Sequence, residues 1–246
     1  MAHPQQLQFI KSVTSLITNN RNFKSKKVLE IGSYDVNGSV RRFFPYADYI
    51  GVDLIKGPGV DLICEGDKVP HENNIYDITI SCECFEHNPN WAATFDNMHR
   101  MTKDGGLVIF TCATTGRPEH GTTRTSPKSS PGTQALNWDY YQNLTEEDFN
   151  ERLNLHNLFK EYFFIANQHS HDLYFLGVKG QQNPIFQIDI IELKKLCLID
   201  QDDLQNRIIN RKSREKFIPK PLRKMFRQLF PENPTSKQSA RQIDQF

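Results

Sequence analysis

Short apolar runs recur between turn residues along the first 180 positions of this chain. Most runs are apolar at successive positions rather than at alternate ones, which is typical of strands covered on both faces. Helical patterns lie between several runs, and this alternation favours a doubly wound α/β sheet. The predicted strands are Lys27–Ile31, Tyr49–Asp53, Val60–Cys64, Asp77–Cys82, Gly106–Cys112, Phe163–Asn167 and Leu173–Lys179. The predicted helices are Leu7–Thr18, Ser39–Phe44, Trp91–Met101 and Glu146–Lys160.

Two connections depart from this regular alternation. Only residues 54–59 separate the second and third predicted strands, and their Gly-Pro-Gly sequence predicts a turn within a bare loop. Residues 113–137 form a polar stretch without periodicity. Long loops of this kind in compact domains are often functional lids or mobile segments, so we expect this stretch to border a site.

The character of the chain changes after Gly180. Apolar positions between Ile188 and Leu198 predict one helix, and the chain beyond Pro231 is polar enough to be disordered. A second predicted helix would carry an apolar stripe opposite basic residues, and that stripe needs cover from the protein body, a second copy or a membrane surface. The stripe consists of Leu222, Met225, Phe226, Leu229 and Phe230.

Charge is distributed unevenly along the chain. Residues 207–227 contain nine Lys and Arg against one Glu, a net charge of +8, so the remainder carries about −7 of the total of +1. We therefore predict a main domain over residues 1–180 and a basic helical extension over residues 181–246 with a disordered end. Contact with a second copy or a membrane surface would run through residues 185–230, and no nucleic-acid platform is evident.

Composition limits where the protein acts. Hydrophobic residues make up 37% of the chain, and no run is long enough to cross a bilayer. The five cysteines are an odd number, which favours buried free thiols in a reducing compartment and predicts a cytoplasmic protein. Cys82 and Cys84 lack a second pair at zinc spacing, so no metal is expected.

A carboxylate and two glycines stand where the first predicted strand turns into a loop. Glu30 lies inside the strand, and Gly32 and Gly38 enclose the loop that follows. Such a turn forms a nucleotide-cofactor crevice in doubly wound sheets. The dinucleotide fingerprint G-x-G-x-x-G is absent, and Asp35 would repel a pyrophosphate. The loop better suits a cofactor with an ammonium, a sulfonium and one carboxylate, which describes S-adenosylmethionine.

Acidic residues follow the next three strands as well. Asp53 ends the second strand, where a carboxylate can bind both ribose hydroxyls. Glu65 follows the third strand, near the expected adenine edge. Glu83, Glu86 and His87 follow the fourth strand at the rim of the same crevice.

These blocks resemble class I S-adenosylmethionine-dependent methyltransferases, and in particular a broad bacterial group with an E-x-L-E-H-like block. The resemblance covers about residues 27–179. It implies a Rossmann-like sheet of seven mostly parallel strands, with the last antiparallel and helices on both faces. The family's tight glycine loop is longer here, and its helix between strands two and three is missing. The residues that the resemblance and the strand ends assign to the cofactor are Glu30, Gly32, Ser33, Gly38, Asp53, Leu54, Glu65, Gly66, Cys82 and Glu83.

The acceptor side is predicted from the polar stretch. Two histidines follow strands at the crevice, and we expect His120 to act as a general base or to orient the acceptor, with His87 supporting the cofactor. The acceptor is predicted to be a polar small molecule or a glycan-like molecule, methylated at oxygen. A nicotinamide-dependent oxidoreductase and a non-catalytic binding protein remain the alternatives. The residues expected to contact the acceptor are Arg117, Glu119, Arg124, Tyr140 and Tyr141.

Overall fold

The computed structural model describes residues 3–17, 23–180 and 183–216. Within them, seven strands form one sheet in the order β3-β2-β1-β4-β5-β7-β6. Strand β7 runs antiparallel to both neighbours, and the other pairs are parallel, as the resemblance implied. The strands are β1 (Lys27–Ile31), β2 (Asp48–Asp53), β3 (Leu62–Ile63), β4 (Tyr76–Cys82), β5 (Thr102–Ala113), β6 (Phe159–Asn167) and β7 (Asp172–Lys179).

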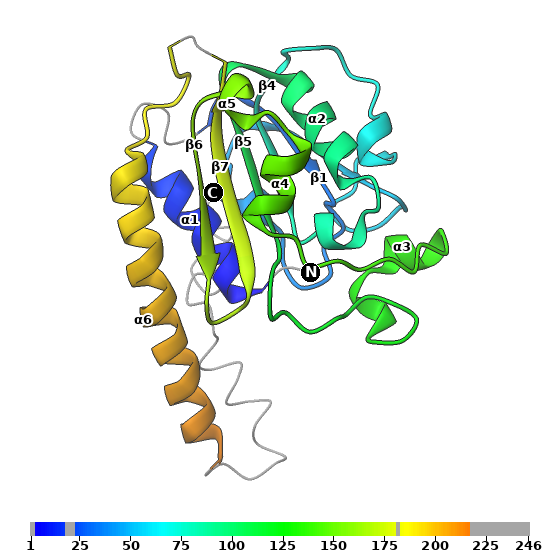
Figure 1. Cartoon of the computed structure of the whole chain (residues 1–246), viewed down its shortest axis with the longest axis vertical. Helices are drawn as coiled ribbons and strands as arrows, with labels where there is room; N and C mark the ends of the chain where they lie inside the picture. Colours follow the sequence, from blue (N-terminus) through cyan, green and yellow to red (C-terminus); the bar gives the residue numbers. More distant parts are fainter. Residues whose placement is uncertain (1–2, 18–22, 181–182, 217–246) are drawn as a thin grey trace, which may run out of the picture.

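Helices cover both faces of the sheet (Figure 1). Helices α1 (Pro4–Leu16) and α6 (Ile190–Lys216) pack on one face, and α2 (Trp91–Met101) and α4 (Glu146–Arg152) on the other. Successive strand residues point to opposite faces, so an uninterrupted apolar run serves two cores. In β1, Val28 joins the core under α1 and Leu29 joins the core under α2. The predicted two-sided sheet is therefore confirmed.

Local sequence explains where two of the helices begin. Pro4 occupies the first turn of α1, where a missing N–H costs nothing. Thr145 caps α4, because its Oγ1 accepts from the N–H of Asp148 while the Asp148 carboxylate accepts from the N–H of Thr145. This capping box was visible as an acidic first turn after a threonine.

Two helix predictions were wrong in extent. Residues 39–44 form only one 3-10 turn, Val40–Phe43, because Pro45 follows and the chain must enter β2 at Asp48. The helix predicted over Glu146–Lys160 ends at Arg152, and Leu153 is extended. After the short helix α5 (Leu155–Leu158), Phe159 and Lys160 already belong to β6. Phe159 packs against Phe95 and Phe175 in the core, so tertiary packing overrides the local helical pattern.

Other boundaries differ by a few residues or more. Strand β3 is only Leu62–Ile63, and the residues between β2 and β3 contain no helix, as the Gly-Pro-Gly sequence predicted. The polar stretch contains a 3-10 turn, Pro127–Ser129, and the short helix α3 (Pro131–Ala135). Helix α6 continues to Lys216, well beyond the predicted Leu198. The second apolar stripe at 222–230 and the predicted disordered end lie outside the described residues.

Helix α6 lies along the N-terminal helix. Asp200 of α6 accepts hydrogen bonds from Gln8 Nε2 at 3.0 Å and from Ser12 Oγ at 2.6 Å, both on α1. His169, beside the β6–β7 turn, pairs with Asp202 of the same helix. The first part of the C-terminal extension is thereby attached to the sheet domain.

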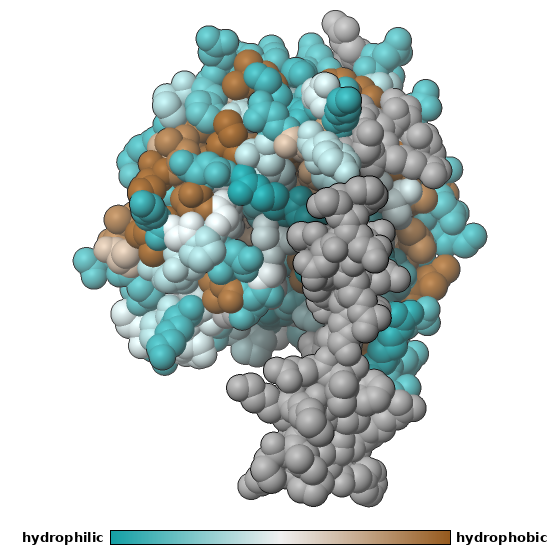
Figure 2. Space-filling model, turned by 180° about the vertical axis from the view of Figure 1, so that it is seen from behind, coloured by the Kyte–Doolittle hydropathy of each residue, from teal (hydrophilic) through white to brown (hydrophobic). Residues whose placement is uncertain are grey.

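The described surface is mixed in character. In the view of Figure 2, apolar residues gather in several separate patches among hydrophilic ones. Among the helices that the structure describes, none combines the length and the apolar character needed to cross a membrane.

Candidate active site

A cleft opens at the carboxyl ends of β1 and β4, where the strand order reverses. Ligands of doubly wound sheets bind at this switch point, because loops diverge there to opposite faces. The cleft is partly enclosed and partly open to solvent. Nine of the ten residues predicted for the cofactor line it: Glu30, Gly32, Ser33, Gly38, Asp53, Leu54, Gly66, Cys82 and Glu83.

Gly32 makes the turn out of β1 possible. Its φ is +82°, and a Cβ at this position would lie 2.7 Å from the Cβ of Cys84. A larger residue would therefore meet both backbone strain and a collision with the β4 loop. The loop is then closed by Asp35, whose Oδ1 accepts from the N–H of Gly38 at 2.6 Å. Asp35, whose carboxylate would repel a pyrophosphate, thus has a structural role in the loop.

Glu30 is buried at the floor of the cleft. Tyr49 Oη on β2 donates a hydrogen bond to its Oε2 at 2.8 Å. Burial raises the pKa of Glu30 to about 7, although the hydrogen bond from Tyr49 and the charge of Arg41 favour the ionised form. A cationic group in the cleft would find a carboxylate here that ionises near neutral pH.

Asp53 is held rigidly at the end of β2. Its Oδ2 accepts from the N–H of Tyr34 at 2.9 Å and its Oδ1 from the N–H of Leu54 at 2.7 Å. Burial raises its pKa, and these two backbone donors oppose the shift. Helix α3 comes close to it, since a Cβ on Gly132 would lie 2.8 Å from Oδ1. The predicted ribose ligand is therefore fixed in orientation and covered by part of the polar stretch.

Glu65 is placed differently from the other predicted cofactor residues. It is absent from the lining of the cleft, and its Oε1 pairs with Lys68 Nζ at 2.7 Å. Gly66, one residue on, does line the cleft. A Cβ there would lie 2.6 Å from Thr94 Cγ2, so the backbone passes close to α2.

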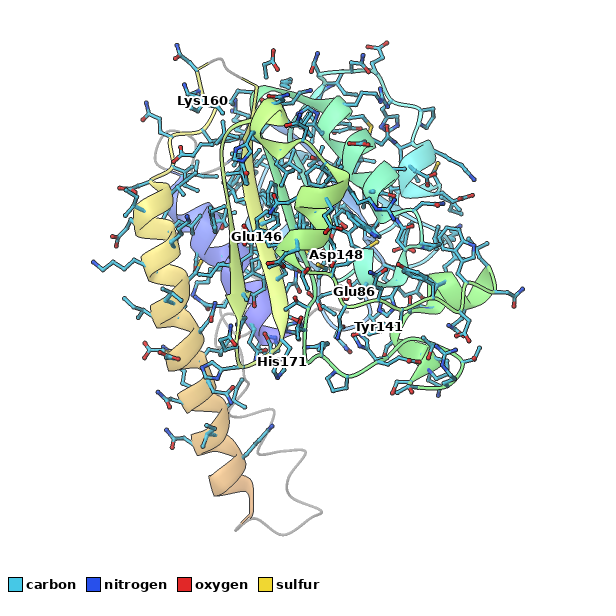
Figure 3. All side chains as sticks on the ribbon, in the orientation of Figure 1. Glu86, Tyr141, Glu146, Asp148, Lys160 and His171 are labelled. Atoms are coloured by element: carbon cyan, nitrogen blue, oxygen red, sulfur yellow. The ribbon has the colours of Figure 1, made fainter. Side chains whose placement is uncertain are left out.

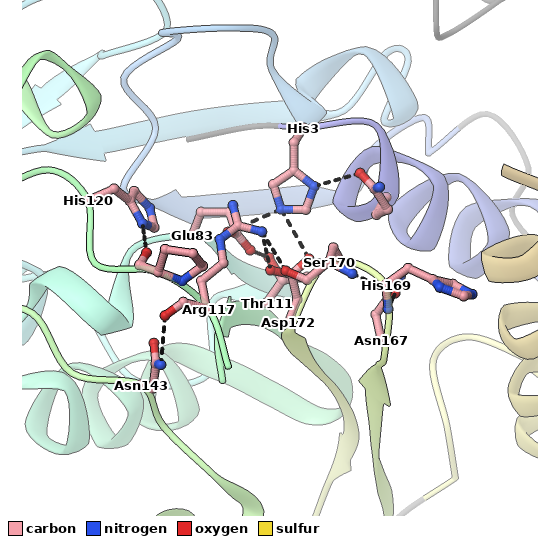
Figure 4. Close-up of polar contacts among 12 residues, drawn as sticks. His3, Glu83, Thr111, Arg117, His120, Asn143, Asn167, His169, Ser170 and Asp172 are labelled. Atoms are coloured by element: carbon pink, nitrogen blue, oxygen red, sulfur yellow. Dashed lines mark hydrogen bonds and ion pairs between the residues drawn. The ribbon is translucent and has the colours of Figure 1, made fainter. Parts of the chain in front are cut away.

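Glu83 sits in an ion-pair network that the sequence did not reveal (Figure 4). Its Oε1 accepts from Thr111 Oγ1 at 2.9 Å, and its Oε2 lies 3.2 Å from His3 Nε2. The same His3 nitrogen lies 3.1 Å from Asp172 Oδ2, and Arg117 Nη1 lies 3.3 Å from Asp172 Oδ1. Glu83 also has a left-handed φ of +53°, which is uncommon for a non-glycine residue and typical of functional positions.

The protonation of His3 and Glu83 in this network depends on how close their opposite charges lie. Burial alone would lower the pKa of His3, yet Glu83 and Asp172 outweigh burial and raise it to about 10. Burial alone would raise the pKa of Glu83, yet the cationic His3 lowers it to about 2. His3 Nδ1 lies 3.2 Å from Gln5 Oε1, so both ring nitrogens face acceptors, as an imidazolium requires.

A second cluster lies on the opposite side of Glu83, toward the polar stretch. The rings of His87 and His120 are 5.0 Å apart, and Tyr141 lies 5.4 Å from the first and 5.1 Å from the second. Glu86 is fully buried beside them, and Figure 3 shows Glu86 and Tyr141 together at the edge where the parallel strands end. Burial lowers the pKa of His87 to about 3 and raises that of Glu86 to about 8.

The predicted acceptor residues separate into two groups. Tyr141 joins the histidine cluster, and its Oη donates to the carbonyl of Pro118 at 3.3 Å. Arg117 faces Asp172 and donates to the Ser170 carbonyl at 2.6 Å. Like Tyr141 and Arg117, the other three lie outside the cleft lining: Glu119 and Arg124 pair with each other, Arg124 also pairs with Asp139, and Tyr140 donates to Gln142.

Sequence reasoning missed several residues of the cleft. Gln6 of α1 is buried in its lining, and His3, just before α1, reaches Glu83. No motif marks either residue, because both depend on how α1 docks on the sheet. Ser130, Pro131 and Thr133 of the α3 region and the nearby Trp138 also line the cleft. They could be foreseen only as members of a long polar loop.

The residues of the cleft fit S-adenosylmethionine. Asp53 offers free lone pairs beside its two backbone bonds, Glu30 offers a carboxylate for an ammonium group, and Gly32 lets the backbone approach closely. These features agree with the expectation from the sequence, although the role of each residue remains a prediction.

Comparison with known proteins supports the same class. The family model described as a methyltransferase domain matches residues 1–171. A comparison with curated protein sequences finds no significant match. Similar solved structures include the YcgJ protein of Bacillus subtilis, 13% identical, with a TM-score of 0.49, covering 73% of this chain and 100% of that one.

Two other similar structures were solved with S-adenosylhomocysteine. A Haemonchus contortus phosphoethanolamine N-methyltransferase is 16% identical with a TM-score of 0.49, covering 71% of this chain and 52% of its own. A Burkholderia thailandensis 1,6-didemethyltoxoflavin N1-methyltransferase is 14% identical with a TM-score of 0.48, covering 70% of this chain and 78% of its own.

The fold, the cleft and the family match define a class I S-adenosylmethionine-dependent methyltransferase. The chain belongs to the methyltransferase-domain family, which accounts for most of its length. The alternative of a nicotinamide-dependent oxidoreductase is therefore set aside.

Proposed function

We propose that this methyltransferase acts on an oxygen atom of a polar small molecule or a glycan-like acceptor. The supporting observation is the set of unsatisfied polar atoms beside the cleft. In the part of the chain that the structure describes, neither carboxylate oxygen of Glu86 and neither ring nitrogen of His87 has a hydrogen-bond partner. Buried polar groups are nearly always hydrogen-bonded, so an acceptor carrying several hydroxyls would complete this site.

S-adenosylmethionine, when bound, supplies an activated methyl group on a positively charged sulfur. The chain must then position the acceptor and provide a destination for its proton. Asp53 would hold the ribose, Glu30 the ammonium group, and Glu83 and Cys82 would border the methionine arm. Ser33, Gly38, Leu54 and Gly66 would contribute shape and backbone contacts, and Glu65 would act from outside the lining.

His120 is the proposed proton acceptor. Its Nδ1 lies 3.1 Å from the carbonyl of Pro118, an arrangement that places the ring proton on Nδ1 and leaves the Nε2 lone pair unprotonated. Burial also lowers the pKa of His120, which keeps the ring neutral. His87 would support the cofactor side, since it lines the cleft and contacts the His120 ring.

Of the five residues predicted to contact the acceptor, Tyr141 would do so directly. Arg117, Glu119, Arg124 and Tyr140 would shape the loop that carries His120, because their polar groups already bind neighbouring residues. The hydrogen bond from Asn143 Nδ2 to the Arg117 carbonyl at 2.9 Å attaches this loop to the segment of Tyr141.

A direct experiment is an acceptor screen with S-adenosylmethionine. Sugars, nucleosides and phenols, with amine analogues of each, are incubated with the enzyme, and S-adenosylhomocysteine is measured by mass spectrometry. We expect product only with hydroxyl acceptors, and His120→Ala should lower turnover by on the order of 10²-fold while S-adenosylhomocysteine binding is kept. Transfer restricted to amines or to carbon would contradict methylation at oxygen.

We further propose a methyltransferase domain over residues 1–180, a basic extension over 181–246, and a cytoplasmic location. The family match covers residues 1–171, and β7 completes the sheet at Lys179, which supports the boundary. All five cysteines are free thiols, which suits a reducing compartment. A self-association or membrane contact through residues 185–230 is tested by measuring the solution mass of the full chain and its binding to lipid vesicles.

A further inference from the structure

The cluster of Glu86, His87 and His120 has the composition of a metal site. One ligand atom from each of the three residues lies within 4.8 Å of the other two. In a tetrahedral site with each ligand atom about 2.1 Å from the cation, the ligand atoms stand about 3.4 Å apart, so movements of about an ångström would bring the three side chains onto one ion. Two imidazoles and one carboxylate form a ligand set that leaves coordination positions open.

The partners of these atoms distinguish the cluster from an ordinary hydrogen-bond network. Glu86 has no exposed surface and His87 is only 3% exposed. Among the described residues, no donor reaches either Glu86 oxygen and no partner reaches either His87 nitrogen. A buried carboxylate without a donor or counter-ion is costly, and a cation would remove that cost.

His120 completes the set from the polar stretch. Its Nδ1 faces the Pro118 carbonyl, so Nε2 has a lone pair available. A backbone carbonyl on the second nitrogen is also the usual way in which a metal-bound histidine is oriented. A Cβ on Gly121, the next residue, would lie 2.7 Å from His87 Cε1, so a glycine allows the loop to bring His120 against His87.

The cluster around His3 serves as an internal contrast. His3, Glu83 and Asp172 also have ligand atoms within 4.8 Å of one another. Their atoms are already matched, however, because Thr111, Ser170 and Arg117 bind the two carboxylates and His3 lies between them. With the same spacing of ligand atoms, the cluster around His3 is therefore a completed ion-pair network, whereas Glu86 and His87 of the other cluster lack hydrogen-bond partners among the described residues.

We propose that Glu86, His87 and His120 bind one divalent transition-metal cation at the acceptor side of the cleft. Two imidazoles with one carboxylate favour Zn²⁺ or Co²⁺ and bind Mn²⁺ more weakly, and they disfavour Mg²⁺ and Ca²⁺, which prefer sites built from oxygen. His87 lines the cleft, so the open positions of the cation are accessible to a hydroxyl oxygen of the acceptor. This inference rests on the proposed function for the identity of the acceptor only. With the cation bound, His120 is a metal ligand, and this role replaces its role as proton acceptor.

Metal binding is tested on the untagged full chain after dialysis against EDTA. MnCl₂ and ZnCl₂ are titrated by calorimetry and bound Mn²⁺ is followed by electron paramagnetic resonance, with MgCl₂ and CaCl₂ for comparison. We expect one equivalent of Mn²⁺ or Zn²⁺ to bind, and Glu86→Gln and His120→Ala each to weaken binding at least about tenfold. His156→Ala is the matched control, because His156 is exposed and contacts only Tyr162 among the described residues.

The outcomes separate the metal site from the proposed function. Absence of Mn²⁺ and Zn²⁺ binding, selective binding of Mg²⁺, or equal binding by His120→Ala would overturn the metal site. If Glu86→Gln does not fold, as judged by circular dichroism, His120→Ala still decides, since His120 lies in a loop. Oxygen methylation in excess EDTA would support the proposed function and contradict the metal site. Bound Mn²⁺ without any oxygen methylation would support the metal site and contradict the proposed function.

Discussion

His3 Nε2 lies 3.2 Å from Glu83 Oε2, although 79 positions separate the two residues along the chain. The pair connects the start of α1 to the loop after β4 (Figure 4), and Gln6 of the same helix lines the cofactor cleft. The Glu83 carboxylate is buried there, and it shares the cationic ring of His3 with Asp172, which also pairs with Arg117.

Replacing His3 with glutamine should destabilise the protein markedly. The substitution leaves two buried carboxylates whose remaining cationic partner among the described residues is Arg117. Breaking a buried pair from one side typically costs about 3–5 kcal/mol. Urea unfolding measures the loss. The matched control is His169→Gln, which breaks the more exposed pair with Asp202 and should cost under about 1 kcal/mol. Equal losses in the two variants would show that the His3 network adds little.

Stability should depend on pH through the same network. The pKa of His3 is about 10 in the folded protein against 6.5 ordinarily, because Glu83 and Asp172 outweigh the opposing effect of burial. Its stabilising contribution is therefore complete below about pH 6.5 and is lost as the pH rises toward 10. The difference in unfolding free energy between the wild type and His3→Gln should therefore be smaller at pH 10 than at pH 7. A constant difference over this range would contradict a charged His3.

Asp53→Asn should weaken cofactor binding by roughly 1–3 kcal/mol, because the ribose hydroxyls lose a charged acceptor. The change keeps the size of the side chain, and one amide oxygen can still accept from a backbone N–H of Tyr34 or Leu54. Calorimetry with S-adenosylhomocysteine measures the effect. Glu65→Gln is the control, since Glu65 lies outside the cleft lining and pairs with Lys68. A larger effect at position 65 than at position 53 would reverse the assignment.

Cofactor affinity should increase as the pH rises through about 7. Burial raises the pKa of Glu30 to about 7, so its carboxylate becomes charged over this range and can then attract the ammonium group. Tyr49→Phe removes the hydrogen bond that favours the ionised form, and the rise should move to higher pH. Calorimetric titrations at several pH values give both midpoints. Identical profiles for the two proteins would remove Glu30 from the pH dependence.

The strand pattern predicted the sheet well because strands buried on both faces produce long apolar runs. It failed at Phe159 and Lys160, where a helical pattern continues past Arg152 but packing against Phe95 makes a strand. Nine of ten predicted cofactor residues line the cleft because parallel strands bring their carboxyl ends to one edge. His3 and the role of Asp172 could not be predicted, since both depend on side-chain contacts between segments far apart in sequence.

Helix α1 has two neighbours with different consequences. Its start places His3 on Glu83, while Gln8 and Ser12 on the same helix bind Asp200 of α6. Events at the C-terminal helix and at the cleft are thereby linked through one rigid element about four turns long. If separating α6 from α1 changes the affinity for the cofactor, thermodynamic reciprocity requires the cofactor to change the equilibrium of that separation by the same factor. The hydrogen bonds of Asp200 to Gln8 and Ser12 are then the contacts through which the first part of the C-terminal extension would act on the cleft.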